Sequence, residues 1–473
     1  MNKYYLLLLL PLLVSCGGGR GKNGVSAEIA PTLSDTLVII TADSHSAGVR
    51  YIENRAIDTA NPPLSIDFSK ENYDETSFDI SKYTSSVEYL IFSHPHGDSA
   101  LFFKGQTLSI VAPNSMSTSN YSVSVRSTAT GYFINDLFSG LHMYDNDGKF
   151  VESVITNTLP YKTSSYDIDV IEVNSEDLEG FAGVINWTHE DNIIAYLVRS
   201  GDNKIKMVVW YDIIKKREVM KRLMAEEERY IATYRISDSI YISAVSPFAD
   251  EPVAMRTFNV YGDTLCLFSD HTPRAERPRG SYVPPESPMF YFLGNDFHIR
   301  FPYNDTIFIL SSASRVLPKY VVDMGEKRVD VKSGMRGGQH GKLMPDRWIE
   351  TDSFILFSSH LNHNSINGRR EGYVRYYYKL YDKRSRKVNT LPSSAYPEDF
   401  LIDNALPDGI PFYFSELRYS GSPGNFSILY GKKDLKKILN DKSFGKLPDA
   451  QKSKVKELYD SLSDGELLLM VIR

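Results

Sequence analysis

Residues 141–149 read Leu-His-Met-Tyr-Asp-Asn-Asp-Gly-Lys, and this pattern decides the expected fold because it returns along the chain. An apolar run leads to an aromatic residue, then to an aspartate and turn-forming residues. Such an aspartate favours a hairpin turn, and the aromatic residue packs the end of the strand before it. Related stretches lie at 208–216, 378–385 and, in degenerate form, 260–264. Their separations fit multiples of a unit of about 50 to 65 residues, which indicates an internal repeat.

Short apolar runs rich in β-branched and aromatic residues fill the chain from about residue 36 to 430 and predict β-strands. The 31 Tyr and 24 Phe, against 3 Trp, also suit a sheet-rich protein. A repeating unit of four strands with a hairpin predicts a β-propeller blade, and a body of about 400 residues would hold roughly six to eight. A pair of β-sandwiches with coincidental hairpins is the alternative. The predicted strands include 37–40, 89–92, 193–198, 205–211, 240–242, 306–310 and 354–357.

Helical patterns are scarce. Residues 434–440 and 449–462 are the best candidates, and 220–228 is compatible with one or two helical turns. In the second candidate Val455, Leu458 and Leu462 fall on one helical stripe. The apolar run 467–472 predicts a buried last strand.

Residues 304–308 read Asn-Asp-Thr-Ile-Phe, and residues 318–325 read Pro-Lys-Tyr-Val-Val-Asp-Met-Gly. Both segments resemble blade motifs of the six-bladed β-propeller lipoproteins of Bacteroidales, an NHL-like family that is largely uncharacterised. Residues 350–357 resemble the next blade, and 403–412 resemble a late segment of the family. The resemblance covers residues 79–473 and implies an all-β propeller of six blades, with a short C-terminal helical segment. Its last strand would complete an early blade and close the ring, and no catalytic residue carries over from the family.

The N-terminus is expected to be a targeting signal. Lys3 precedes an apolar run at 4–13, too short for the roughly 20 residues of a spanning helix, so it predicts a secretory signal. Its end, Leu-Val-Ser-Cys at 13–16, resembles a bacterial lipobox, which implies cleavage before Cys16 and a lipid on Cys16. An ordinary signal peptide or a membrane anchor is the alternative. The expected organisation is a signal peptide at 1–15, a lipidated tether at 16–35, flexible because of its glycines, and a propeller at 36–473.

Lipoprotein sorting by the residue after the cysteine, here Gly17, favours the outer membrane and leaves open whether the body faces the periplasm or the exterior. The formal net charge of −6, without a long basic run, argues against a nucleic-acid partner. No cofactor is expected. Cys266 would be alone in the mature chain, and the alternation around it predicts a buried apolar thiol.

One motif could hold a metal. His94, His96 and Asp98 follow an apolar strand and resemble the start of a metallo-β-lactamase-type zinc site. Ser99 stands where that motif needs another histidine, so a polar loop leaving the strand is the favoured interpretation. Further ligands are candidates by residue type alone, namely His142, His189, His340, His360 and His363.

Three further segments are candidates for binding. Residues 360–364 predict a solvated loop. The glycine-rich segment 337–341 predicts a linker between blades, with an anion-binding cap as the alternative. The arginine cluster at 274–279 predicts an extended loop, with docking of an acidic partner as the alternative.

The pattern as a whole favours a non-enzymatic, lipid-anchored envelope protein that binds a glycan, a peptide or another envelope protein. Loops from all the blades of a propeller meet at the mouth of its channel, a geometry suited to binding. A metal-dependent hydrolase using His94, His96 and Asp98 is the first alternative. A structural subunit of an outer-membrane assembly is the second.

Overall fold

The computed structural model describes residues 39–40, 61–70, 72, 78–93, 123–128, 131–136, 140–156, 180–187, 193–199, 206–223, 228–245, 253–269, 289–301, 303–329, 341–361, 375–395, 401–402, 404–419 and 426–473. Contacts divide the chain into two units, Met1–Thr36 and Leu37–Arg473, and all described residues belong to the second. None of the described helices is long and apolar enough to cross a membrane.

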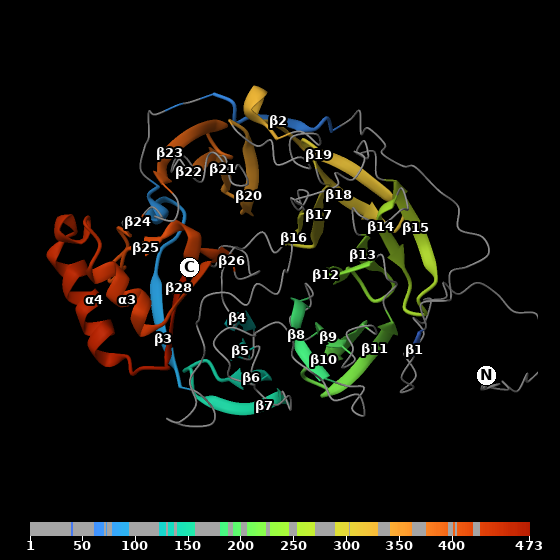
Figure 1. The fold of residues 1–473 in the computed structure, drawn as a ribbon, viewed down its shortest axis with the longest axis horizontal. Helices are drawn as coiled ribbons and strands as arrows, with labels where there is room; N and C mark the ends of the chain where they lie inside the picture. The colour runs from blue at the N-terminus through green and yellow to red at the C-terminus, as the bar shows by residue number, and fades with distance from the viewer. Residues whose placement is uncertain are drawn as a thin grey trace, which may run out of the picture. The chain divides into compact units, whose positions relative to one another are not determined.

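The described residues form six sheets of four or five strands, and in Figure 1 their colours follow the chain except for the early strands, drawn blue, that join later sheets. The first sheet contains β4 (Val123–Thr128), β5 (Gly131–Asp136), β6 (Gly140–Tyr144) and β7 (Phe150–Thr156). The second contains β8 (Gly180–Trp187), β9 (Ile193–Arg199), β10 (Lys206–Asp212) and β11 (Arg217–Leu223). The third contains β12 (Glu228–Arg235), β13 (Tyr241–Val245), β14 (Val253–Phe258) and β15 (Thr264–Ser269).

The later sheets repeat this plan. The fourth contains β16 (Met289–Leu293), β17 (Asp296–Arg300), β18 (Thr306–Ser312) and β19 (Arg315–Asp323). The fifth contains β20 (Leu343–Glu350), β21 (Phe354–Leu361), β22 (Arg375–Asp382) and β23 (Lys387–Ala395). The sixth contains β26 (Arg418–Tyr419), β27 (Phe426–Tyr430), β28 (Leu467–Ile472) and the early strand β3 (Val87–Phe92). A further two-stranded sheet joins β24 (Leu401–Ile402) and β25 (Phe412–Tyr413).

The four strands named for each of the first five sheets are consecutive in sequence, and neighbours among them pair antiparallel, which is the plan of propeller blades. The expected all-β class is therefore confirmed, and each predicted strand among the described residues is present. One local expectation is wrong. Of the segment 220–228, residues 220–223 belong to strand β11, which pairs with β10, and Glu228 begins β12, so its described residues form strands and not a helical turn.

The repeat that predicted the fold is the hairpin between the third and fourth strands of a sheet. The carboxylate of Asp145 accepts the N–H of Asp147 and Lys149, at 3.0 and 2.8 Å, between β6 and β7. Asp212 accepts the N–H of Lys215 at 2.9 Å between β10 and β11, and Asp382 accepts that of Ser385 at 2.6 Å between β22 and β23. The degenerate copy follows the same plan, with Asn259 in place of the aspartate.

Apolar residues join each sheet to the next. Phe133 of the first sheet packs with Ile194 of the second, and Trp210 of the second packs with Tyr241 of the third. The third and fourth sheets share a core that contains the buried thiol of Cys266, as expected for that residue. Three further cores join the fourth sheet to the fifth, the fifth to the sixth, and the sixth back to the first. The six sheets thus share their cores in a cycle.

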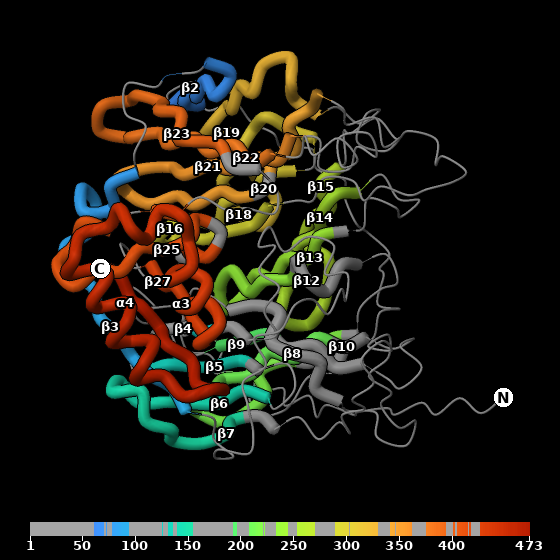
Figure 2. Tube along the Cα trace, turned by 60° about the vertical axis from the view of Figure 1, so that its left-hand side comes forward, coloured from blue at the N-terminus to red at the C-terminus, as the bar shows by residue number. Residues whose placement is uncertain are grey.

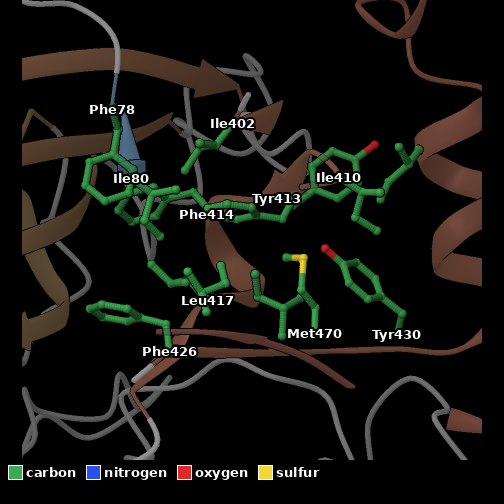
Figure 3. Packing of buried hydrophobic residues seen from close by; sticks show 14 of the residues in the cluster. Phe78, Ile80, Ile402, Ile410, Tyr413, Phe414, Leu417, Phe426, Tyr430 and Met470 are labelled. Atoms are coloured by element: carbon green, nitrogen blue, oxygen red, sulfur yellow. The ribbon is translucent and has the colours of Figure 1, made fainter. Parts of the chain in front are cut away.

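Two helices cover the outside of the sixth sheet, α3 (Lys432–Leu439) and α4 (Asp449–Ser461), and Figure 2 shows them side by side. Both were predicted. Leu435 and Ile438 of α3 and Val455 of α4 are buried in the largest core. In Figure 3 that core contains Phe426, Tyr430 and Met470 beside residues from the segments around Phe78 and Phe414.

The last strand joins the two ends of the body. β28 pairs antiparallel with β27 and, on its other side, with β3 from the early part of the chain. The family resemblance implied that the last strand would complete an early blade. Instead the early strand completes the last sheet, because β26, β27 and β28 already lie together.

Segments that precede β3 add to the outer strands of other sheets. β1 (Ile39–Ile40) pairs parallel with β11, and β2 (Leu64–Asp67) pairs parallel with β19. The N–H of Thr390 in β23 donates to the carbonyl of Asn72 at 2.7 Å, and the N–H of Asn72 donates to Oγ1 of Thr390 at 3.1 Å. From β1 to β3 the chain thus joins the second, fourth, fifth and sixth sheets in turn. The added strands cover sheet edges that would otherwise be open to pairing.

Candidate functional site

Several residues singled out from sequence lie outside the described part of the chain. They are the lipidation candidate Cys16, the motif His94, His96 and Asp98, the further histidines His189, His340 and His363, and Arg274, Arg277 and Arg279. The motif begins just beyond Ser93. The carbonyl of Ser93 accepts the hydroxyl of Tyr144 at 2.9 Å, and its hydroxyl donates to Glu466 at 2.8 Å.

Of the candidate histidine ligands, His142 and His360 lie in the described part of the chain, in β6 and β21 respectively. His142 is buried in β6, with Nδ1 3.0 Å from Ser153 Oγ. His360 was expected in a solvated loop, and that expectation is wrong. Strand β21 continues to Leu361, and His360 is buried with its ring edge against Tyr376. No group of three or more histidine, cysteine or acidic residues among the described residues is arranged to hold a metal ion.

The two segments with the most specific motifs meet between the fourth and fifth sheets. Oε1 of Glu350, at the end of β20, accepts the hydroxyl of Tyr320 at 2.5 Å and Nζ of Lys383 at 2.7 Å. Its Oε2 accepts the hydroxyl of Tyr291, from β16, at 2.6 Å. The side chain of Glu350 is 0% exposed. We call these four residues the Glu350 tie.

Glu350 and the two tyrosines of the Glu350 tie each have one protonation state at neutral pH. Burial alone would raise the pKa of Glu350, but the charge of Lys383 and the hydrogen bonds outweigh it and hold the pKa below its ordinary value. Burial and the neighbouring carboxylate raise the pKa of Tyr291 and Tyr320. The carboxylate is therefore ionised, the phenols are protonated, and three donors occupy its oxygens. A group in this state holds two sheets together and is a poor acid or base near pH 7.

His298 lies beside the Glu350 tie and is neutral. Its ring stacks on Tyr291 at 4.6 Å, and Nε2 is 3.0 Å from Nζ of Lys319. Because an ammonium group only donates, Nε2 is the acceptor and Nδ1 carries the proton, which points to the carbonyl of Asp296 at 3.2 Å. Burial lowers the pKa of His298 to about 4.

A cavity of about 220 Å³ lies between the same two sheets. Its apolar lining comes from Phe68, Met324, Leu343, Phe357 and Leu361. Its polar lining comes from Ser69, Gly325, Glu326, Lys327, Ser359, Tyr377 and Lys379. Four parts of the chain contribute, namely the segment after β2, the end of β19 with the 3₁₀ turn η2 (Gly325–Lys327), the start of β20, and the β21–β22 pair.

Local contacts fix the wall formed by the segment after β2. Phe68 stacks on Phe357 at 5.0 Å with nearly parallel rings, and its N–H donates to the carbonyl of Asp323 at 2.7 Å. Gly325 has φ +67°, and a Cβ there would lie 2.9 Å from Cβ of Ser69. Only glycine allows this turn so close to Ser69. The motif at 318–325 thus shapes one wall of the cavity.

Strand β22 contributes a nearly buried cation to the lining. Lys379 is 8% exposed, and Nζ donates to the carbonyl of Lys70 at 2.8 Å and to Oγ1 of Thr390 at 2.7 Å. At the rim, Glu326 and Lys327 are exposed, and neither forms an ion pair with any of the described residues. The cavity therefore joins an aromatic and aliphatic surface to two ammonium groups and one carboxylate.

Sequence reasoning did not identify this cavity. The motifs at 318–325 and 350–357 mark two of the chain segments around it, but their residues indicate only the strands and turns of a blade. Lys379 lies in the repeat stretch 378–385. Because side chains alternate along β22, Lys379 is on the same face as Tyr377, and both line the cavity. The contribution of Phe68 and Ser69 had no sequence signal, since it depends on the parallel pairing of β2 with β19.

Solved structures offer distant similarities. A member of the DUF4221 family from Bacteroides vulgatus shares 6% identity over 83% of this chain and 98% of that chain, with a TM-score of 0.41. The β-propeller domain of the Trilobed protease from Pyrococcus furiosus shares 11% identity over 65% and 84%, with a TM-score of 0.25. The Dos1 propeller shares 9% identity over 74% and 68%, with a TM-score of 0.30. These values are too low to carry an argument about fold or function.

No curated protein matches the chain. The family described as a domain of unknown function, DUF4933, matches residues 46–441, which include all six sheets apart from β1, β28 and the end of the chain. A match of this extent covers most of the body and the whole lining of the cavity. The chain belongs to the DUF4933 family.

Proposed function

We propose that the protein is a non-enzymatic binding protein built on a six-bladed β-propeller. The cycle of shared cores supports six blades, because each sheet packs on its sequence neighbour and the sixth packs on the first. The pairing of β28 with β3 supplies the closure that such a ring needs. The motifs at 304–308 and 318–325 support kinship with the NHL-like propeller lipoproteins of Bacteroidales.

The proposal includes attachment to the bacterial outer membrane through a lipid on Cys16. The Leu-Val-Ser-Cys sequence at 13–16 and the glycine-rich stretch at 17–24 support it. Mass spectrometry of the chain isolated from membranes tests this part. A diacylglyceryl group on Cys16 is expected, and a free thiol at Cys16 would contradict the anchor.

The cavity between the fourth and fifth sheets is the proposed binding site, and it is the observation that carries the function. Its volume of about 220 Å³ lies below the roughly 300 to 1,000 Å³ of sites for drug-sized ligands. It therefore suits a small ligand or one end of a longer one. Aromatic and aliphatic walls favour an apolar group, while Lys379 and Lys327 favour an anion. A peptide C-terminus with an apolar last residue combines both properties.

A thermal-shift titration tests the site with three small probes, N-acetyl-leucine, N-acetyl-leucinamide and glucose. Binding to the native state raises the melting temperature by mass action. N-acetyl-leucine is expected to give the largest shift, since it has both the apolar group and the carboxylate. A larger shift with glucose would assign the cavity to a glycan and contradict the peptide terminus.

Leu361→Trp is the test variant because Leu361 lines the cavity at the end of β21 and makes no polar contact there. The larger side chain fills the space and should abolish the shift. Ile214→Trp is the matched control, since Ile214 is 53% exposed in the turn after β10. An equal shift in the wild type and both variants would place the probe elsewhere and contradict the proposed site.

Metal-dependent hydrolysis by His94, His96 and Asp98 is a separate hypothesis with a separate test. Elemental analysis of protein purified without chelator measures it. Stoichiometric zinc that is lost in His94→Ala would favour the hydrolase. Metal-free protein with unchanged stability in that variant would remove it.

A further inference from the structure

The helical hairpin outside the sixth sheet carries a local excess of positive charge. Residues 432–446, which form α3 and the turn after it, contain six lysines and two aspartates and so have a net charge of +4. The whole chain has a net charge of −6, so the remainder carries −10. This basic segment therefore stands out from an acidic body.

Four of these lysines point into solvent without a carboxylate partner. Lys433, Lys436, Lys442 and Lys446 are exposed, and none forms an ion pair with a residue in the described ranges. We call these four residues the lysine face. Lys437 is different, because its Nζ lies 3.9 Å from the ring centre of Tyr413 and is already engaged.

The helix orients the lysine face away from the core. Leu435 and Ile438 are fully buried, and Lys433 and Lys436 are three residues apart on the opposite side of α3. Lys442 and Lys446 continue the charge through the turn that contains η4 (Phe444–Lys446).

The two aspartates in this segment are held by other groups. The carboxylate of Asp434 accepts the N–H of Gly431 at 2.7 Å and caps the start of α3. Asp441 accepts the N–H of Ser443 at 2.8 Å and the hydroxyl of Tyr413 at 3.0 Å. Burial would raise the pKa of Asp441, but its hydrogen bonds hold the pKa below the ordinary value. Neither carboxylate forms an ion pair with the lysine face.

From this geometry we propose that the lysine face docks the body onto the anionic lipid headgroups of a membrane surface. Exposed ammonium groups gathered on a helix and the turn after it are the electrostatic footprint of such a surface. The occupant follows from charge complementarity and from the lipid on Cys16, so the biological setting rests on the proposed function. A lipid anchor of one or two chains benefits from a basic patch as a second, weaker membrane contact.

Vesicle sedimentation tests the docking with the full chain carrying Cys16→Ser, which removes the site of lipid attachment. Vesicles of phosphatidylcholine alone are compared with vesicles that contain 30% phosphatidylglycerol, a mixture chosen for roughly physiological surface charge. Tighter binding to the anionic vesicles is expected, with loss of the difference at about 1 M salt, where the Debye length is about 3 Å. Equal binding to both vesicle types would overturn the proposal.

The decisive variant changes all four members of the lysine face to Gln. Each lysine near an anionic surface contributes on the order of fivefold to binding, so the affinity for anionic vesicles should fall by about a hundredfold or more. The matched control removes four exposed charges from hairpin turns and the strand ends beside them, through Lys149→Gln, Arg315→Gln, Arg384→Gln and Lys387→Gln. An equal fall in both variants would overturn the proposal, because it would show a dependence on total charge alone.

Membrane docking and ligand binding in the cavity can be tested independently of each other. The variant without the lysine face should keep the thermal shift with N-acetyl-leucine, since the cavity is lined by the fourth and fifth sheets and the segment after β2. Preference of the wild type for polyglutamate over anionic vesicles would assign the face to an acidic protein partner and overturn membrane docking.

Discussion

The hydroxyl of Tyr320 lies 2.5 Å from Oε1 of Glu350, and this contact joins two sheets through two motifs that are 30 residues apart. Lys383 and Tyr291 complete the arrangement from the fifth and fourth sheets. The carboxylate is buried, ionised and occupied by donors. The cavity lies between the same two sheets.

Glu350→Gln should destabilise the protein by about 3 kcal/mol, because it leaves Lys383 beside a neutral amide in place of its buried partner. Urea denaturation at pH 7 measures the change. Glu457→Gln is the control, since Glu457 forms an exposed ion pair with Lys454 at 2.9 Å and should cost less than about 1 kcal/mol. Equal effects of the two substitutions would contradict a structural role for the tie.

His298 should make the stability depend on pH between about 6.5 and 4. Its pKa is lowered in the folded protein to about 4, so in this window the unfolded state binds more protons and stability falls as the pH falls. His298→Gln should flatten the slope of the free energy of unfolding between pH 7 and pH 5, where most carboxylates remain ionised. A slope unchanged by the substitution would show that His298 is not the responsible group.

Tyr89 links β3 to the turn at 404–410. Its hydroxyl donates to the carbonyl of Asp408 at 2.7 Å and accepts the N–H of Ile410 at 3.1 Å. Tyr89→Phe should therefore cost about 1 to 3 kcal/mol in the free energy of unfolding. Tyr261→Phe is the control, because Tyr261 is 62% exposed, and should be neutral. A neutral Tyr89→Phe would mean that this link does not help to hold the two ends of the body together.

Lys327 should set the preference of the cavity for an anion. Lys327→Gln removes a rim charge that has no ion pair in the described structure, so folding should be unaffected. The affinity for N-acetyl-leucine should fall by roughly two- to fivefold, as for one exposed charge interaction, and that for N-acetyl-leucinamide should stay the same. A parallel fall for both probes, measured by calorimetric titration, would contradict an electrostatic role.

Much of the architecture was predictable because it depends on local patterns. The aromatic-aspartate turns located the third hairpin of three sheets, and the apolar stripe of Val455, Leu458 and Leu462 located α4. The strand at 217–223 was missed, since Glu218 and Lys221 interrupt its apolar residues and its stability comes from pairing with β10. The loop expected at His360 failed for a similar reason, because β21 extends to meet β22.

The candidate site was less predictable than the fold. Its walls depend on Phe68 reaching Phe357 and on Ser69 reaching Gly325, contacts that span more than 250 residues. No local pattern specifies such contacts, since they follow from the parallel addition of β2 to the edge of the fourth sheet. The candidate metal motif of His94, His96 and Asp98 falls outside the described residues, so the metal hypothesis stays a prediction.

Calorimetric titration of N-acetyl-leucine into the wild-type protein and Leu361→Trp tests the central claim most directly, combined with mass spectrometry of the recovered probe. The account predicts one saturable site in the wild type, none in Leu361→Trp, and a probe recovered unchanged. Binding that persists in Leu361→Trp would contradict the cavity as the site, and a hydrolysed probe would contradict a protein that binds without catalysis.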